Sequence, residues 1–143
     1  MSVAAILAPL FVLVALTFLL MFWTGGVRTA SIKSGETRAR DIVLGQDNWP
    51  PRVLQIGNAY NNQFQLPVLF YVASLVALWL GPTLLELVLA YAFVATRYVH
   101  AAIHITTNNV VRRFAAYTAG LVVLCVFWAD LLVRTLLIAF GAN

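Results

Sequence analysis

The chain has 143 residues, of which 62% are hydrophobic and 10% are charged. Soluble domains carry about a quarter of charged residues, so this composition excludes an ordinary soluble globular domain. Nine Lys and Arg against five Asp and Glu leave a net charge of +4, which requires no nucleic-acid partner. The length is sufficient for one domain, 1–143, with about four membrane-crossing helices of about 20 residues each.

The first predicted span is residues 3–23, which contain no charged residue. This length crosses the hydrocarbon core as a helix. No basic segment precedes the span, and no small-residue cleavage pattern precedes the two glycines after it, so we expect an uncleaved anchor. The polar stretch 24–57 follows, and Pro50 and Pro51 interrupt helical structure near its end.

Three further spans are predicted at residues 58–80, 83–104 and 113–140. The second span begins in amide-rich sequence, and Pro67 inside it removes a backbone donor, which predicts a bend. A Gly-Pro turn separates the second span from the third. The fourth span is long, so we expect it to tilt or to extend beyond the membrane.

The charges indicate an orientation. An even number of spans places the long first loop and the third loop on one side, and the Gly-Pro turn and both termini on the other. Basic residues concentrate on the cytoplasmic side of membrane proteins, so we expect these two loops to be cytoplasmic. The cations in or beside them are Arg28, Lys33, Arg38, Arg40, Arg52, Arg112 and Arg113.

Polar residues inside the spans predict a shared cleft. Ionisable residues in a span are costly and usually face protein or water. In the third span, Arg97, His100 and His104 lie within about 60° of one another on a helix. Arg113 and Tyr117 lie one turn apart at the start of the fourth span. On the second span, one face with an arc of about 100° carries four amide side chains, those of Asn58, Asn61, Asn62 and Gln65.

This cleft offers cations, amides, imidazoles and a phenol, which favour an anionic ligand. Arg113 begins a helix, where the helix dipole also favours negative charge. A small acidic thiol fits, because a guanidinium and a helix N-terminus both lower the pKa of a thiol. The single cysteine, Cys125, lies in an apolar run and excludes an internal disulfide framework, so we expect the thiol to come from a ligand.

Other interpretations of these residues remain open. Arginines and histidines near span ends can snorkel, and amide-rich helix starts can be caps. His100 suits helix-to-helix hydrogen bonding as well as ligand contact. His100 and His104 have the spacing of a paired-His zinc site. Arg97 is a poor neighbour for a cation, so we expect no metal.

The opposite end of the spans holds a second polar group. Asp130 and Arg134 have i, i+4 spacing, so we expect them to pair, with Glu86 sharing the arginine. We interpret this group as structural, with a proton relay as the alternative.

Three stretches and two residues carry a family resemblance. They are TGGVR (24–28), NNQFQLPVLFY (61–71), RYVHAAIH (97–104), Arg113 and Tyr117. Together they resemble the MAPEG family, the membrane-associated proteins in eicosanoid and glutathione metabolism, in particular its bacterial members. The resemblance covers nearly the whole chain, and the last stretch with its two following residues is its most specific part.

The resemblance implies an all-α integral membrane four-helix bundle that assembles as a homotrimer in a bacterial inner membrane. Glutathione would bind between subunits near the cytoplasmic side. Arg113 falls on the arginine held to activate its thiol, and Tyr117 on a tyrosine beside it. The implied binding residues are Arg28, Asn62, Gln65, Arg97, His100 and His104.

Three positions of the chain depart from the family pattern. Gln65 replaces the glutamate expected to accept from the ammonium of glutathione, and a neutral bond there is weaker. Asn61 stands where eukaryotic members often have arginine, and His104 where they often have tyrosine.

The resemblance therefore implies a glutathione-dependent transferase or peroxidase acting on a hydrophobic electrophile or lipid hydroperoxide. Its expected partners are other copies of the chain, membrane lipids and an apolar substrate that arrives from the bilayer. A noncatalytic lipid-binding or scaffolding trimer is the alternative. A third hypothesis is an anion or proton pathway that depends on Arg97 or Arg134.

Overall fold

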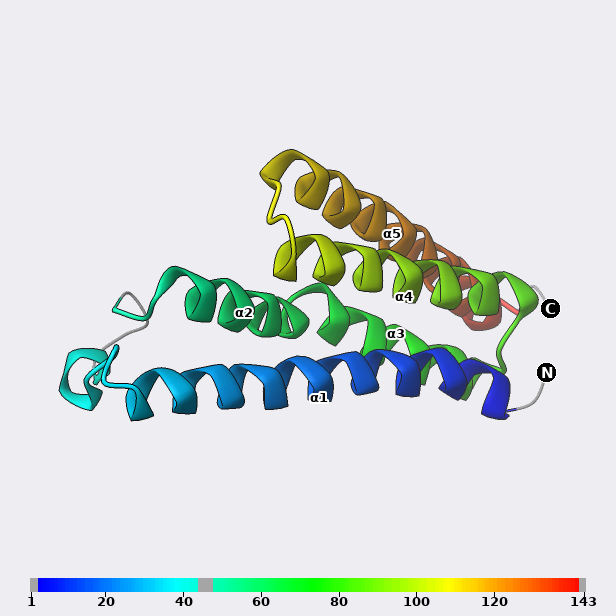
Figure 1. Cartoon of the computed structure of the whole chain (residues 1–143). Helices are drawn as coiled ribbons and strands as arrows, with labels where there is room; N and C mark the ends of the chain where they lie inside the picture. Colours follow the sequence, from blue (N-terminus) through cyan, green and yellow to red (C-terminus); the bar gives the residue numbers. More distant parts are fainter. Residues whose placement is uncertain (1–2, 44–47, 142–143) are drawn as a thin grey trace.

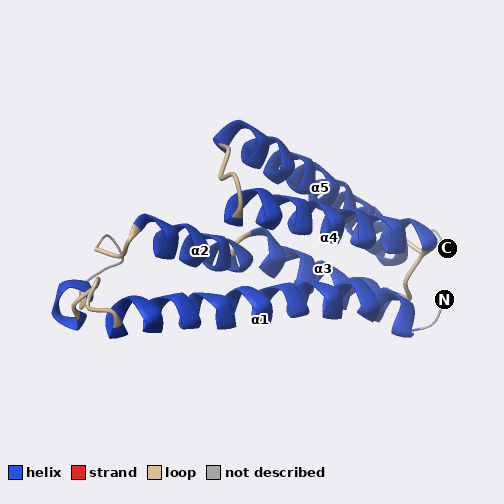
Figure 2. Cartoon of the chain, viewed as in Figure 1, coloured by secondary structure: helices blue, strands red, loops and turns tan. Residues whose placement is uncertain are grey.

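The computed structural model describes residues 3–43 and 48–141, which are helical with connecting turns and contain no strand (Figure 2). The all-α fold class is therefore confirmed for these residues. Within these described ranges, two single-turn 3₁₀ segments, η1 and η2, accompany five α-helices. The elements are α1 Val3–Lys33, η1 Ala39–Ile42, α2 Pro51–Asn61, η2 Asn62–Phe64, α3 Leu66–Leu80, α4 Leu84–Ile105 and α5 Val110–Ala139.

The helices form an elongated bundle (Figure 1). Helix α1 runs along it, α2 and α3 follow one another beside α1, and α4 packs against both α1 and α5. The start of α1, the α3–α4 turn and the end of α5 lie at one end of the bundle. Four segments are long and apolar enough to cross a membrane: Val3–Lys33, Pro51–Leu80, Leu84–Ile105 and Val110–Ala139.

Two helices begin earlier than the hydropathy pattern predicts. The prolines near residue 50 do not end a helix, because Pro51 occupies the first turn of α2. Proline fits that position, since the first N–H groups of a helix have no partner within it. Asn109 caps α5, and its side chain accepts from the Arg112 backbone N–H at 3.0 Å. Both helices thus extend past the apolar core of the span.

The bend predicted at Pro67 is present as a break between α2 and α3. Gln65 lies outside both helices, with φ −101° and ψ −108°. Pro67 sits in the first turn of α3, where its missing N–H is not required. The break therefore falls just before the proline, and it leaves Asn62 in a separate 3₁₀ turn beside α4.

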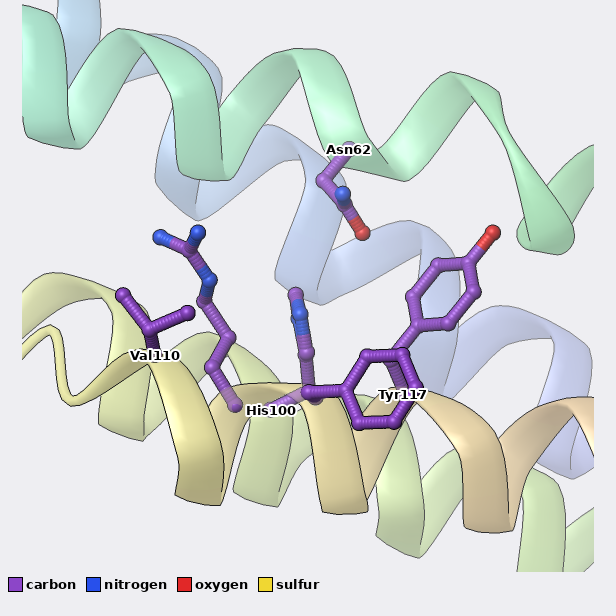
Figure 3. A pocket seen from close by; sticks show the side chains of 6 residues that line it. Asn62, His100, Val110 and Tyr117 are labelled. Carbon is purple, nitrogen blue, oxygen red and sulfur yellow. The ribbon is translucent and has the colours of Figure 1, made fainter.

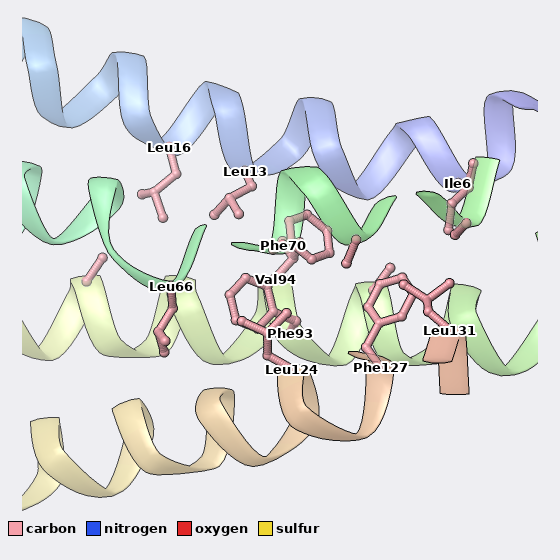
Figure 4. Close-up of a cluster of buried hydrophobic side chains, with 14 of the residues drawn as sticks. Ile6, Leu13, Leu16, Leu66, Phe70, Phe93, Val94, Leu124, Phe127 and Leu131 are labelled. Atoms are coloured by element: carbon pink, nitrogen blue, oxygen red, sulfur yellow. The ribbon is translucent and has the colours of Figure 1, made fainter. Parts of the chain in front are cut away.

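Aromatic rings from three helices form the centre of the core (Figure 4). The ring centroids of Phe70 and Phe93 are 4.8 Å apart, and Phe127 meets Phe70 at 6.4 Å. Gly120 lets α5 approach α4 closely, since a Cβ there would lie 2.7 Å from the Thr96 hydroxyl oxygen. Lipid is as apolar as these side chains, so close packing holds such helices together.

The structure confirms Glu86 as a partner of Arg134 and corrects the predicted pair with Asp130. Arg134 pairs with Glu86 rather than Asp130, and its Nη2 donates to the carbonyls of Leu80 (3.1 Å) and Gly81 (2.9 Å). Asp130 Oδ2 is buried without a hydrogen-bond partner. The carbonyls at the end of α3 lack intrahelical partners, so the arginine satisfies them together with a fully buried carboxylate.

Candidate functional site

Arg97 on α4 is the centre of the polar cluster. Its side chain is 0% exposed, and its Nη2 donates to Asn62 Oδ1. The same nitrogen lies 3.5 Å from His100 Nδ1, and the guanidinium carbon lies 5.8 Å from the centre of the Tyr117 ring. Nε and Nη1 are buried without hydrogen-bond partners. Unsatisfied donors on a buried cation are costly, so this geometry suits an anionic acceptor.

The two histidines continue the cluster along α4. Their ring centroids are 5.7 Å apart, and the His100 ring lies 5.9 Å from that of Tyr117 on α5. Both side chains are buried, and His104 Nδ1 has no hydrogen-bond partner. Within residues 3–43 and 48–141, no three His, Cys, Asp or Glu side chains gather as a metal site would require.

Arg113 lies in the first turn of α5. Its Nη1 donates to Asn108 Oδ1 at 2.6 Å, which anchors the guanidinium to the α4–α5 turn. Asn108 itself has a positive φ of 49°, a conformation that asparagine tolerates better than most residues. The arginine is therefore held at a helix N-terminus, where the guanidinium and the helix dipole both favour negative charge.

A pocket of about 220 Å³ lies beside this cluster (Figure 3), and neither Arg97 nor His104 lines it. Asn62 enters it from the break after α2, His100 from α4, and Tyr117 from α5. Val110 and Phe114 complete the lining with Arg113, and both apolar side chains are largely exposed. The pocket thus has a polar wall and an apolar edge that faces away from the bundle.

The structure brings together seven of the eight residues predicted for the site. Gln65 joins through Asn62, whose Nδ2 donates to Gln65 Oε1 at 3.1 Å. The others are Asn62, Arg97, His100, His104, Arg113 and Tyr117.

Arg28 lies elsewhere in this chain. It packs on α2, where a Cβ at Gly57 would be 3.2 Å from its Nη2. Its guanidinium carbon lies 5.3 Å from the Trp49 ring centre. It does not line the pocket, because the part of α1 that carries it runs beside α2 (Figure 1).

Sequence reasoning missed two residues that support the site. Gln55 Nε2 donates to the His104 carbonyl, and Arg52 Nη1 donates to the Ile105 carbonyl, each at 2.6 Å. These contacts from α2 satisfy carbonyls at the end of α4 that have no intrahelical partner. Pro51 could have revealed them, because a proline fits the first turn of a helix, and a helix that begins at Pro51 contains both Arg52 and Gln55.

One of three comparisons with known proteins found a match. Searches of curated proteins and of solved structures found no match. The sequence model of the MAPEG family matches residues 6–133, a range that includes every predicted site residue. The resemblance inferred from the motifs is therefore confirmed, and the chain belongs to the MAPEG family.

Proposed function

We propose that this chain is a membrane-bound enzyme that uses glutathione as a cosubstrate. It would transfer glutathione to a hydrophobic electrophile or use it to reduce a lipid hydroperoxide. The observation that carries the proposal is the buried Arg97, whose Nε and Nη1 lack partners, beside a pocket lined by Arg113 and Tyr117. The MAPEG family includes glutathione transferases and peroxidases, which supports this choice.

The donors of the site fit the acceptors of glutathione. The ligand carries two carboxylates and two peptide carbonyls, all of which accept hydrogen bonds. Arg97 offers two unpartnered nitrogens, and Asn62 and His100 lie beside it. Bonds from a guanidinium to a carboxylate are charge-assisted and among the stronger hydrogen bonds in proteins. These residues would hold the peptide groups and carboxylates of glutathione, and His104 and Gln65 would contact it from the edge of the site.

Arg113 and Tyr117 would act on the sulfur. A guanidinium at a helix N-terminus stabilises a thiolate, which is the nucleophilic form. The Tyr117 hydroxyl would donate a hydrogen bond to that sulfur. In transfer, the sulfur bonds to the electrophilic carbon while the leaving group departs with its electron pair, and the thiol proton passes to solvent. Val110 and Phe114 would receive the apolar substrate from the bilayer.

A homotrimer would complete the site. The pocket of about 220 Å³ is smaller than the 300 to 1,000 Å³ typical of small-molecule sites. We propose that a neighbouring copy supplies the remaining surface, with its Arg28 against the bound glutathione. We also propose that the bundle lies in a bacterial inner membrane with its long first loop in the cytoplasm, as the positions of the cations predict.

The test is glutathione conjugation of chlorodinitrobenzene by the purified protein in detergent, with hydroperoxide reduction measured in parallel. Arg113→Ala is expected to lower kcat about 100-fold, as removal of a charge-stabilising donor does in other enzymes. Arg112→Ala is the matched control, because this neighbouring arginine does not line the pocket. Equal rates for the wild type and Arg113→Ala would remove Arg113 from the mechanism.

A noncatalytic scaffolding or lipid-binding trimer is the second candidate. The neutral Gln65 favours it, because that side chain binds an ammonium less strongly than a carboxylate would. Calorimetric titration separates the two candidates: an enzyme of the proposed type gives heat with millimolar glutathione, and a scaffold gives none.

A further inference from the structure

The hydrogen bonds around Asn62 have a fixed direction. A guanidinium only donates, so the Asn62 oxygen must accept from Arg97 Nη2. The Asn62 nitrogen then donates, and Gln65 Oε1 accepts from it at 3.1 Å. The far end of this relay, from Arg97 through Asn62 to Gln65, is therefore the NH₂ group of the exposed Gln65 side chain, which is a donor.

The rest of the site is also rich in donors. Arg97 Nε and Nη1 are buried and unpartnered. The sequence contains no Asp or Glu between Asp47 and Glu86, nor between Glu86 and Asp130, so no carboxylate comes from the segments that line the pocket. An ammonium carries only donors and needs acceptors. These segments thus offer an ammonium only neutral acceptors, and the oxygens of Asn62 and Gln65 each already accept one hydrogen bond.

We infer that the site takes an anionic thiol peptide without requiring a free amino group. The inference rests on the proposed function and names the ligand class of the same site. The Gln65 NH₂ group and the Arg97 nitrogens would bind carboxylate or amide oxygens of the ligand. Removal of the ligand's ammonium then leaves its affinity unchanged or improves it.

The decisive comparison uses glutathione and glutaryl-cysteinylglycine, which is glutathione with its amino group replaced by hydrogen. Calorimetry in detergent would measure Kd for both thiols with the wild type and with Gln65→Glu. In the wild type we expect the analogue to bind within about threefold of glutathione, or more tightly. In Gln65→Glu, a charge-assisted bond becomes available, so glutathione should bind about tenfold more tightly than the analogue.

Thr107→Glu is the matched control. It adds a carboxylate on an exposed residue of the α4–α5 turn, outside the relay. This variant should keep the wild-type ratio of the two Kd values. A wild type that binds glutathione tenfold more tightly than the analogue overturns the inference and leaves the proposed function standing. A wild type that binds neither thiol overturns both.

Discussion

A buried arginine without a carboxylate partner contributes differently to folding and to binding. Arg97 is 0% exposed, and its described contacts are with an amide, an imidazole and an aromatic ring, on Asn62, His100 and Tyr117, rather than with a carboxylate. Burial of a charge without full compensation opposes folding. The side chain therefore adds little to stability unless an acceptor reaches its free nitrogens, and its chemistry points to a ligand.

Arg97→Met tests this separation. Methionine has a similar length and no charge, so the variant loses one hydrogen bond to Asn62 but also loses the cost of a buried cation. We expect a thermal unfolding midpoint equal to or above that of the wild type, together with an affinity for glutathione lowered at least about tenfold. Differential scanning fluorimetry and calorimetry measure the two quantities. A lower midpoint with unchanged affinity would assign Arg97 a structural role.

At the scale of the helices, the contact between α4 and α5 positions the two halves of the site. His100 and Arg97 come from α4, and Arg113 and Tyr117 from α5. Gly120 lies against Thr96, whose hydroxyl donates to the Phe93 carbonyl at 2.7 Å. The threonine is short and held in place, so it has little freedom to move aside.

Gly120→Ala is expected to destabilise the bundle. The new Cβ would lie 2.7 Å from Thr96 Oγ1, and such overpacking costs about 1–3 kcal/mol. The double variant Gly120→Ala, Thr96→Ala removes the clashing hydroxyl and should recover most of the loss. Denaturant unfolding in mixed micelles measures both free energies of unfolding. If the double variant is no more stable than Gly120→Ala, the close approach at Thr96 is not the cause.

The helices differ in how far the sequence alone predicts them. The four spans and the Arg97, His100 and His104 stripe follow from local hydropathy and helical spacing, so they were predictable. The start of α2 was not, because Pro51 has the same local signal at a helix start as in a loop. Glu86 was expected to share Arg134 and does so, whereas the expected pair between Arg134 and Asp130 does not form. An i, i+4 rule describes one helix and carries no information about Glu86 on another.

The location of Arg28, outside the pocket of its own chain, bears on how copies of the chain would assemble. Within one chain it contacts Gly57 and Trp49 and does not line the pocket. Large apolar side chains, such as Phe22 and Phe114, are exposed on the outer faces of the bundle. Lipid or further copies of the chain would cover such faces. In a cyclic trimer each copy presents the same two surfaces, so Arg28 of one copy can serve the pocket of the next.

Subunit mixing tests this assembly. If Arg28 acts across the boundary, Arg28→Ala and Arg113→Ala chains are each inactive alone, but every pocket in a mixed trimer draws on two chains. A pocket is intact when its Arg113 comes from the Arg28→Ala chain and its Arg28 from the other. Every trimer that contains both kinds of chain then has one intact pocket in three, so conjugation by the mixed trimers should return to about a third of the wild-type rate. Mixed trimers purified through two different tags, with each single variant as control, supply the measurement. If Arg28 acted in its own chain, no mixed trimer would hold an intact pocket, and activity would remain at the level of the single variants.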